Sequence, residues 1–160
     1  MPTQERPRTS VKDRALRLLS VRSRSRSELR FRLIRAGYDP DEVDAAVADL
    51  EAVGLVDDER FAREVAESTR RRGMGRRAGL AALRQKGVDR ELAEEVVGDV
   101  NPEDDAERAF VAARARLGRL GALSPHVAYR RTVAYLIRRG YEPIIAATAV
   151  RRAAAEEDGR

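Results

Sequence analysis

The chain has 160 residues, of which 42% are hydrophobic, 37% charged and only 4% aromatic, with a formal net charge of +5. This length fits one domain, or a few small units sharing a continuous core, in which alanine, leucine and valine supply most of the packing. The absence of cysteine excludes disulfides, thiol catalysis and cysteine-ligated metals. A reducing compartment is consistent with that absence, so the expected location is the cytoplasm.

No apolar run approaches the roughly 20 residues that a membrane helix needs, so we expect no membrane partner. The basic residues are almost all arginine, a skew that genomic base composition alone can produce. A modest positive charge is compatible with binding nucleic acid or an acidic protein surface, and it does not distinguish the two.

Nine amphipathic helices are predicted, because no segment alternates with period two for long enough to be a strand. A polar tail over residues 1–10 is expected to be disordered. The first helix then covers 11–19, and Ser27 is the expected N-cap of the second helix. Gly37 ends that helix where a left-handed residue is favoured, and Asp39-Pro40 starts the third.

The junction over residues 54–62 reads Gly-Leu-Val-Asp-Asp-Glu-Arg-Phe-Ala and opens the fourth helix. Asp57 or Asp58 can accept hydrogen bonds from the free N–H groups at a helix start, and we assign neither a catalytic role. Four apolar residues around the junction are expected to anchor it in a core: Leu55, Val56, Phe61 and Val65. We therefore interpret the junction as the link between consecutive helical units.

Five more helices follow, each bounded by a cap or a glycine. The fifth ends at Gly87, Asp89 caps the sixth, and the seventh covers about 103–117. The eighth begins at Ser124-Pro125 and ends at Gly140, after which Glu142-Pro143 opens the ninth. The tail over 156–160 is expected to fray.

Three glycines, Gly37, Gly87 and Gly140, mark an internal repeat with a period of about 50 residues. In each copy a leucine lies four residues before the glycine, an apolar residue follows it, and an acidic residue then starts a helix. Such turns can recur by chance in helical proteins, but three matches in one register favour a repeat. The predicted fold is all-α, with three tandem three-helix, helix-turn-helix-like repeats over 11–56, 57–102 and 103–155 that form an extended curved array.

Catalytic and metal chemistry find no support in the sequence. His126 is the only histidine, and it follows a proline in the first turn of a helix. Paired carboxylates lie at helix starts or on polar faces, where capping and solubility explain them. Neither a glycine-rich phosphate loop nor a nucleophile elbow occurs. We expect no cofactor and no enzymatic activity.

Two arginine clusters are the candidate binding residues. Arginine pairs bidentately with carboxylate or phosphate, although a solvated arginine-rich surface is the simpler alternative. The first cluster spans residues 22–32 and the second spans 70–77, where no acidic residue occurs from Thr69 to Lys86. The residues selected as partner-binding or DNA-binding candidates are Arg24, Arg26, Arg30, Arg70, Arg71, Arg72, Arg76 and Arg77.

These residues and motifs resemble the RecX family, regulators of the RecA recombinase, over about residues 15–153. The most specific match is the junction at 54–62, and Leu83-Arg84-Gln85-Lys86-Gly87-Val88 adds to it. The resemblance implies three tandem three-helix repeats and binding to RecA filaments on single-stranded DNA. It also implies inhibition of strand exchange, ATP hydrolysis and co-protease activity, and hence a place in homologous recombination, DNA repair and the SOS response. The expected state is a monomer.

One departure from the repeat is Ile144-Ile145, which follows Pro143 where the first repeat has Asp41-Glu42. The alternative function is direct DNA binding, because each glycine turn between two helices is similar to a helix-turn-helix. Acidic residues on the third helices argue against this alternative, since they would repel a phosphate backbone. Filament binding and weak direct DNA binding can coexist through the arginine clusters.

Overall fold

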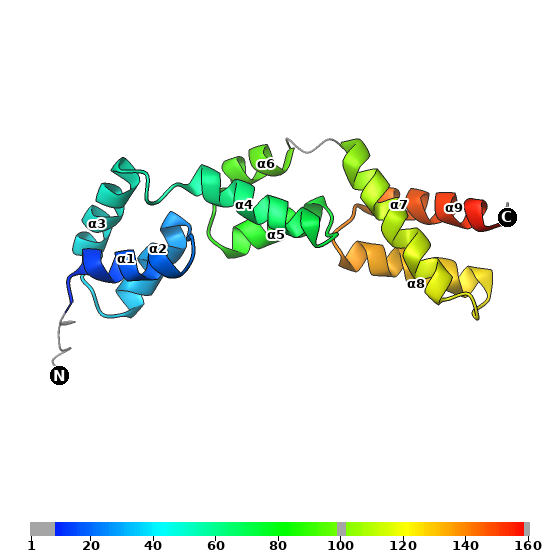
Figure 1. Cartoon of the computed structure of the whole chain (residues 1–160), viewed down its shortest axis with the longest axis horizontal. Coiled ribbons are helices and arrows are strands. Elements are labelled where there is room, and N and C mark those ends of the chain that lie inside the picture. The colour runs from blue at the N-terminus through cyan, green and yellow to red at the C-terminus, as the bar shows by residue number, and fades with distance from the viewer. Residues whose placement is uncertain (1–8, 99–101, 159–160) are drawn as a thin grey trace. The chain divides into compact units, whose positions relative to one another are not determined.

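The computed structural model describes residues 9–98 and 102–158, and all regular structure within these ranges is α-helical (Figure 1). The all-α prediction is therefore confirmed. The helices are α1 (Val11–Val21), α2 (Arg26–Arg35), α3 (Pro40–Ala52), α4 (Asp58–Arg71), α5 (Arg76–Gln85), α6 (Arg90–Gly98), α7 (Pro102–Arg119), α8 (Pro125–Arg138) and α9 (Pro143–Asp158). Not one of the helices in these ranges combines the length and the apolar character needed to cross a bilayer.

The three predicted glycine turns share one geometry. Gly37, Gly87 and Gly140 have φ angles of 91°, 72° and 88°, which only glycine adopts without strain. In each turn the N–H of the residue after the glycine donates to the leucine carbonyl five residues earlier, at 3.3, 3.1 and 3.2 Å. This is the hydrogen bond of a Schellman cap, so the repeated sequence pattern encodes a repeated helix ending.

Helix starts follow the predicted caps in most places. The Asp39 carboxylate accepts from the N–H groups of residues 41 and 42, and the Asp89 carboxylate accepts from those of residues 91 and 92. Asp57 caps α4 through the Arg60 N–H at 2.9 Å. Asp58 instead accepts from the Arg26 N–H at 2.7 Å, and so joins α4 to the start of α2.

The prediction of Ser27 as the cap of α2 was wrong. Ser25 is the N-cap, and its hydroxyl oxygen accepts from the Glu28 N–H at 3.0 Å. The same hydroxyl donates to the carbonyl of Lys86, 61 residues away in the chain. Ser25 is completely buried and Ser27 is exposed, so a contact with a distant segment decides where α2 begins.

Both chain ends differ slightly from expectation. Ser10, placed within the expected tail, is the N-cap of α1 and accepts from the Asp13 N–H at 3.1 Å. The α9 helix continues to Asp158, so residues 156–158 are helical where fraying was expected. Residues 1–8 and 159–160, which complete the expected tails, lie outside the described ranges.

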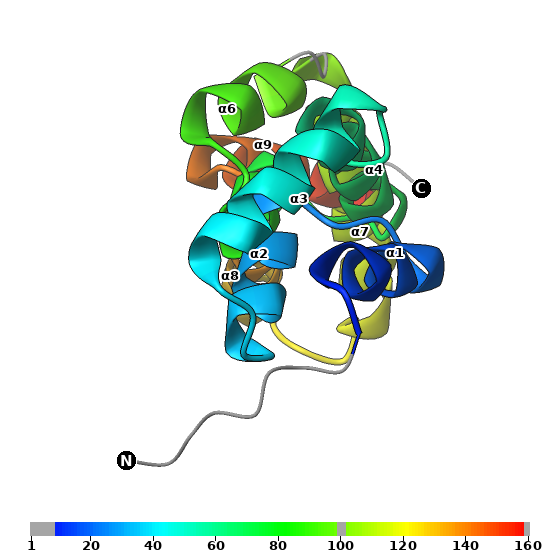
Figure 2. The same cartoon turned by 90° about the vertical axis from the view of Figure 1, so that its left-hand side faces the viewer.

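The chain divides into two compact units. The first contains residues up to 64 together with 83–93, and the second contains 65–82 together with the residues from 94 onward. In the first unit α1, α2 and α3 pack around Leu29, Leu33, Val43 and Val47 (Figures 1 and 2). The predicted boundaries between the three repeats, after residue 56 and after residue 102, follow the order of the helices along the chain. They remain a prediction.

The core of the second unit forms where α7, α8 and α9 pack on one another. Alanine lines much of it, with Leu136, Tyr141 and Val150 as the larger residues that are fully buried. Small residues let the helices approach closely, which compensates for the scarcity of aromatic side chains. The expectation that alanine, leucine and valine supply the packing is met here.

The junction at 54–62 is anchored by fewer residues than predicted. Val56 and Phe61 are 3% and 4% exposed, as expected. Val65 is only half-buried, and Leu55 is 50% exposed and does not anchor the junction. A tight turn explains this, because the N–H groups of residues 55 and 56 both donate to the Leu50 carbonyl and only one of the two side chains can face the core.

Candidate partner-binding surfaces

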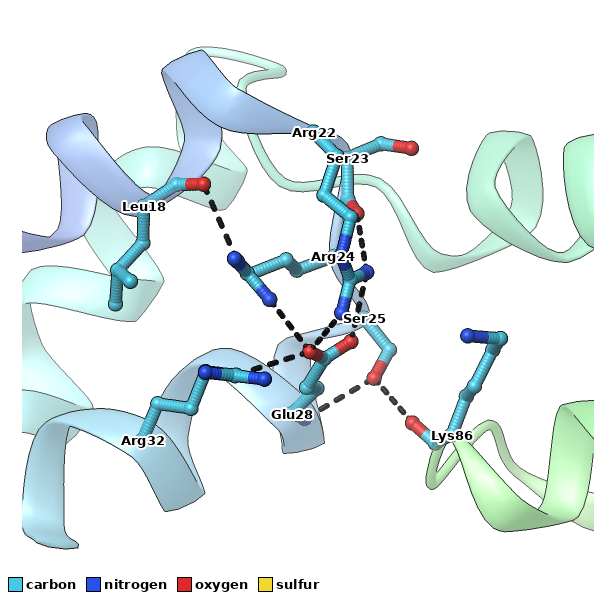
Figure 3. Close-up of polar contacts among 8 residues, drawn as sticks. All are labelled: Leu18, Arg22, Ser23, Arg24, Ser25, Glu28, Arg32 and Lys86. Atoms are coloured by element: carbon cyan, nitrogen blue, oxygen red, sulfur yellow. Dashed lines mark hydrogen bonds and ion pairs between the residues drawn. The ribbon is translucent and has the colours of Figure 1, made fainter.

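Glu28 lies at the centre of the first arginine cluster (Figure 3). Its carboxylate accepts from Arg24 at 2.6 Å and from Arg32 at 3.1 Å, and Arg22 donates to both of its oxygens. Burial by itself raises the pKa of Glu28, but the hydrogen bonds from the three arginines outweigh it and hold the pKa below its ordinary value. One carboxylate therefore organises three guanidinium groups.

Arg24 is a structural residue in this cluster. Its side chain is only 6% exposed, and its Nε donates to the carbonyl of Leu18 at 3.2 Å (Figure 3). The guanidinium thus fastens the end of α1 to the start of α2. Arg24 is therefore a weaker candidate binding residue than the exposed arginines, because its guanidinium is held inside the fold.

Arg26 and Arg30 are exposed, but each faces a carboxylate of α3. Arg30 contacts Asp44 at 2.6 and 3.2 Å, and Arg26 lies 3.5 Å from Glu51. The hydrogen bond from Arg30 also keeps the pKa of the Asp44 carboxyl below its usual range. These two exposed arginines of the first cluster are therefore paired with acidic residues of α3 that the fold brings alongside them.

The second cluster is only partly neutralised. Glu67, one helical turn earlier, lies 3.1 Å from Arg70 and 3.8 Å from Arg71. Arg76 also lies close to a carboxylate of α7, Asp105, which is 29 residues later in the chain. The lack of acidic residues between 69 and 86 thus did not mean a lack of acidic neighbours.

Asp105 is buried, being 5% exposed, and lies 2.6 Å from Arg108. Burial raises its pKa, and the charges of Arg108 and Arg76 offset part of that rise. Its second carboxylate oxygen has no protein partner among the described residues. The fold therefore brings a buried carboxylate of α7 close to the start of α5.

Arg72 and Arg77 are exposed, and neither has an acidic partner among the described residues. They flank a loop that is tied to the glycine turn at 139–140. The Gly75 N–H donates to the Arg139 carbonyl at 2.8 Å, and the Arg77 N–H donates to the Gly140 carbonyl at 3.0 Å. Arg139 returns a hydrogen bond from Nε to the Gly73 carbonyl at 3.1 Å.

This contact adds Arg138 to the basic surface, since it is exposed at the end of α8 next to the tied turn. We call Arg72, Arg77 and Arg138 the loop surface. Arg138 was not among the residues predicted from the sequence, because about 60 residues separate it from the other two. The only sequence signal was Gly140, whose place in the repeat predicted a turn and said nothing about what the turn contacts.

No group of three or more histidine, aspartate or glutamate side chains that could hold a metal occurs in the part of the chain that the structure describes. The candidate functional sites are the arginine surfaces described above. A guanidinium offers planar paired donors, which suit phosphate or carboxylate oxygens on a partner.

Family models match two segments of the chain. Residues 12–50 match the family model for the RecX first three-helix domain, and residues 57–97 match that for the second. A protein named Regulatory protein RecX from Mycobacterium leprae (strain Br4923) is 40% identical, with 96% of each chain covered. One of the same name from Amycolatopsis mediterranei (strain U-32) is 36% identical, covering 94% of this chain and 86% of its own.

A solved structure shares the fold. The crystal structure of RecX from Lactobacillus salivarius superposes with a TM-score of 0.83 at 19% sequence identity, covering 91% of this chain and 95% of the other. The two matched family domains agree with the identities to relatives that are covered over most of their length. The chain belongs to the RecX family.

Proposed function

We propose that this protein is a non-enzymatic cytoplasmic regulator that binds RecA filaments assembled on single-stranded DNA and inhibits their recombinase, ATPase and co-protease activities. The observation that carries the proposal is family membership, because relatives covered over most of their length are named regulatory proteins. The repeated helical turns support it. Linked binding elements that contact successive subunits of a regular filament act together through effective concentration.

The loop surface is the best candidate contact. Arg72 and Arg77 have no acidic partner among the described residues, whereas Arg26 and Arg30 are paired with α3. An unpaired exposed arginine gains a full ionic contact when a partner arrives and loses no existing one. Of the eight arginines selected from the sequence, Arg72 and Arg77 therefore remain the strongest candidates, and Arg70, Arg71 and Arg76 flank them.

Direct DNA binding is the second candidate, and one observation favours it. The α3 carboxylates Asp44, Asp49 and Glu51 lie within 2.6–3.5 Å of Arg30, Lys12 and Arg26. Their charges are thus largely compensated, so α3 repels a phosphate backbone less than its sequence suggests. The two functions make different predictions about what the protein binds when RecA is absent.

The test is a pull-down that compares RecA alone, single-stranded DNA alone, and RecA assembled on single-stranded DNA with a slowly hydrolysed nucleotide. We expect retention to be strongest on the assembled filament, together with a dose-dependent fall in RecA ATP hydrolysis. Equal retention on naked DNA and on the filament, with unchanged ATP hydrolysis, would instead favour the DNA-binding candidate.

A further inference from the structure

The described residues of the first unit line an open hollow of about 640 Å³. This volume is within the range of small-ligand sites. α1, α2 and the turn after α5 contribute to its wall. Its charged lining consists of five cations and one carboxylate. These residues are Arg14, Arg22, Arg32, Arg35, Lys86 and Glu28.

The lining of the hollow carries a net positive charge, because five cations face one carboxylate. That carboxylate is already hydrogen-bonded to arginines. Glu28 accepts hydrogen bonds from Arg22, from Arg32 and from the buried Arg24 (Figure 3). Arg14 and Arg35 are exposed and have no ion-pair partner among the described residues. They are free to meet an anionic ligand.

Phe31 lies on the wall of the same hollow and is 61% exposed. The chain has only three phenylalanines, and the other two, Phe61 and Phe110, are 4% and 5% exposed. Leaving an aromatic ring in water forgoes the stabilisation that its burial gives. An exposed ring beside unpaired arginines is the arrangement by which proteins hold single strands, with bases stacked on the ring and phosphates on the cations.

We infer that this hollow binds single-stranded nucleic acid, with one base stacked on Phe31 and the adjoining phosphates on Arg14 and Arg35. A duplex does not fit this use, because its base faces are already stacked on one another. The carboxylates of an acidic peptide would pair with the arginines. They would not stack on the Phe31 ring, which is apolar and makes no hydrogen bonds. The inference deepens the proposed function, since it assigns the single strand of the filament to a contact apart from the loop surface.

The experiment measures the anisotropy of a fluorescein-labelled oligothymidylate strand titrated with the full chain, without RecA. Phe31→Ala is expected to weaken binding roughly 5- to 150-fold, the range that loss of one stacked base corresponds to, and Phe31→Trp is expected to restore it. Arg14→Gln should lower the slope of log affinity against log salt by about 0.7, the value for one phosphate contact on a single strand.

Matched controls separate the hollow from a general surface effect. Val53→Ala removes another exposed apolar side chain of the first unit, and Arg17→Gln removes another exposed arginine of α1; neither residue lines the hollow. Both controls are expected to bind like the unaltered chain. A strand carrying abasic sites should bind the unaltered chain and Phe31→Ala equally, since this strand has no base to stack on the Phe31 ring.

Three results would overturn the inference. They are no measurable binding of the unaltered chain to the strand, equal strand binding by Phe31→Ala, and a Phe31-dependent affinity for duplex DNA or oligoglutamate but not for the strand. Inhibition of RecA by the unaltered chain tests the proposed function separately. Failure of strand binding with inhibition intact defeats only the inference, whereas loss of inhibition with Phe31-dependent strand binding defeats only the proposed function.

Discussion

Gly75 lies directly against Gly140: a Cβ built on Gly75 would come within 2.5 Å of the Gly140 carbonyl oxygen. The Gly75 N–H also donates to the neighbouring Arg139 carbonyl at 2.8 Å. The equivalent contact in the first unit joins Ser25 to the carbonyl of Lys86, the residue before Gly87. The residue before α2 thus contacts the turn that ends α5, and the residue before α5 contacts the turn that ends α8.

Gly75→Ala should destabilise the protein by roughly 1–3 kcal/mol, the usual range for inserting a methyl group into a packed site. Backbone atoms surround the position, so no flexible side chain can move aside. The control is Gly118→Ala in α7, where nothing lies within 4 Å and alanine should stabilise the helix by roughly 0.5 kcal/mol. Chemical denaturation measures both, and equal free energies of unfolding for the two variants would contradict the close contact.

Ser25→Ala should lower the free energy of unfolding by about 1–2 kcal/mol, because it removes the N-cap of α2 and leaves the Lys86 carbonyl without its donor. Ser27→Ala, two residues later on an exposed surface, should change it by less than about 0.5 kcal/mol. Thermal melts of the pair distinguish the cap that the structure shows from the one that the sequence predicted. The reverse order of effects would restore Ser27.

Phe61→Ala should cost roughly 3–5 kcal/mol, since the side chain is 4% exposed. Phe31→Ala removes the same atoms from a side chain that is 61% exposed, and should cost less than about 0.5 kcal/mol. Denaturant titrations of the two variants give the comparison. A loss well below 1 kcal/mol for Phe61→Ala would mean that Phe61 does not anchor the junction.

Glu28→Gln should destabilise the protein by about 3 kcal/mol at pH 7, because it leaves the buried Arg24 without a counter-charge. The folded-state pKa of Glu28 lies below its ordinary value of about 4.5. The carboxylate therefore stabilises the fold above that pH, and its contribution is lost as the pH falls through the folded-state pKa. Stability curves of both proteins from pH 7 to pH 2.5 should converge at the acid end, and a constant difference would exclude this ionisation as the cause.

The pair Arg72→Gln and Arg77→Gln should weaken inhibition of RecA ATP hydrolysis and leave the thermal melt unchanged, because both side chains are exposed. Arg26→Gln with Arg30→Gln removes the same charge from arginines that are already paired with α3. We expect this control to inhibit almost as well as the unaltered chain. Full inhibition by the first pair would show that the filament contact lies outside the loop surface.

The helices, their approximate ends and the glycine turns could be predicted from the sequence alone. These depend on local physics: apolar residues recurring at helical spacing, carboxylates that cap the next few N–H groups, and glycine at positive φ. Gly37, Gly87 and Gly140 could be recognised because each cap closes within about six residues. The burial of Phe61 followed from the same periodicity. The exposure of Leu55 could not be predicted in this way, because a turn that places Val56 in the core leaves the neighbouring side chain outside.

Which arginines are free to bind a partner depends on how the helices pack. Arg26 and Arg30 stand in a basic run, yet α3 neutralises them from 14 to 25 residues away, and Glu28 fixes Arg24 inside the fold. Ser25 and Ser27 are equally good caps by residue type, and the Lys86 carbonyl selects Ser25 across 61 residues. Ion pairs and hydrogen bonds of this kind depend on distance in space. The sequence therefore showed which side chains could bind a partner, and the packing determined which of them remain available.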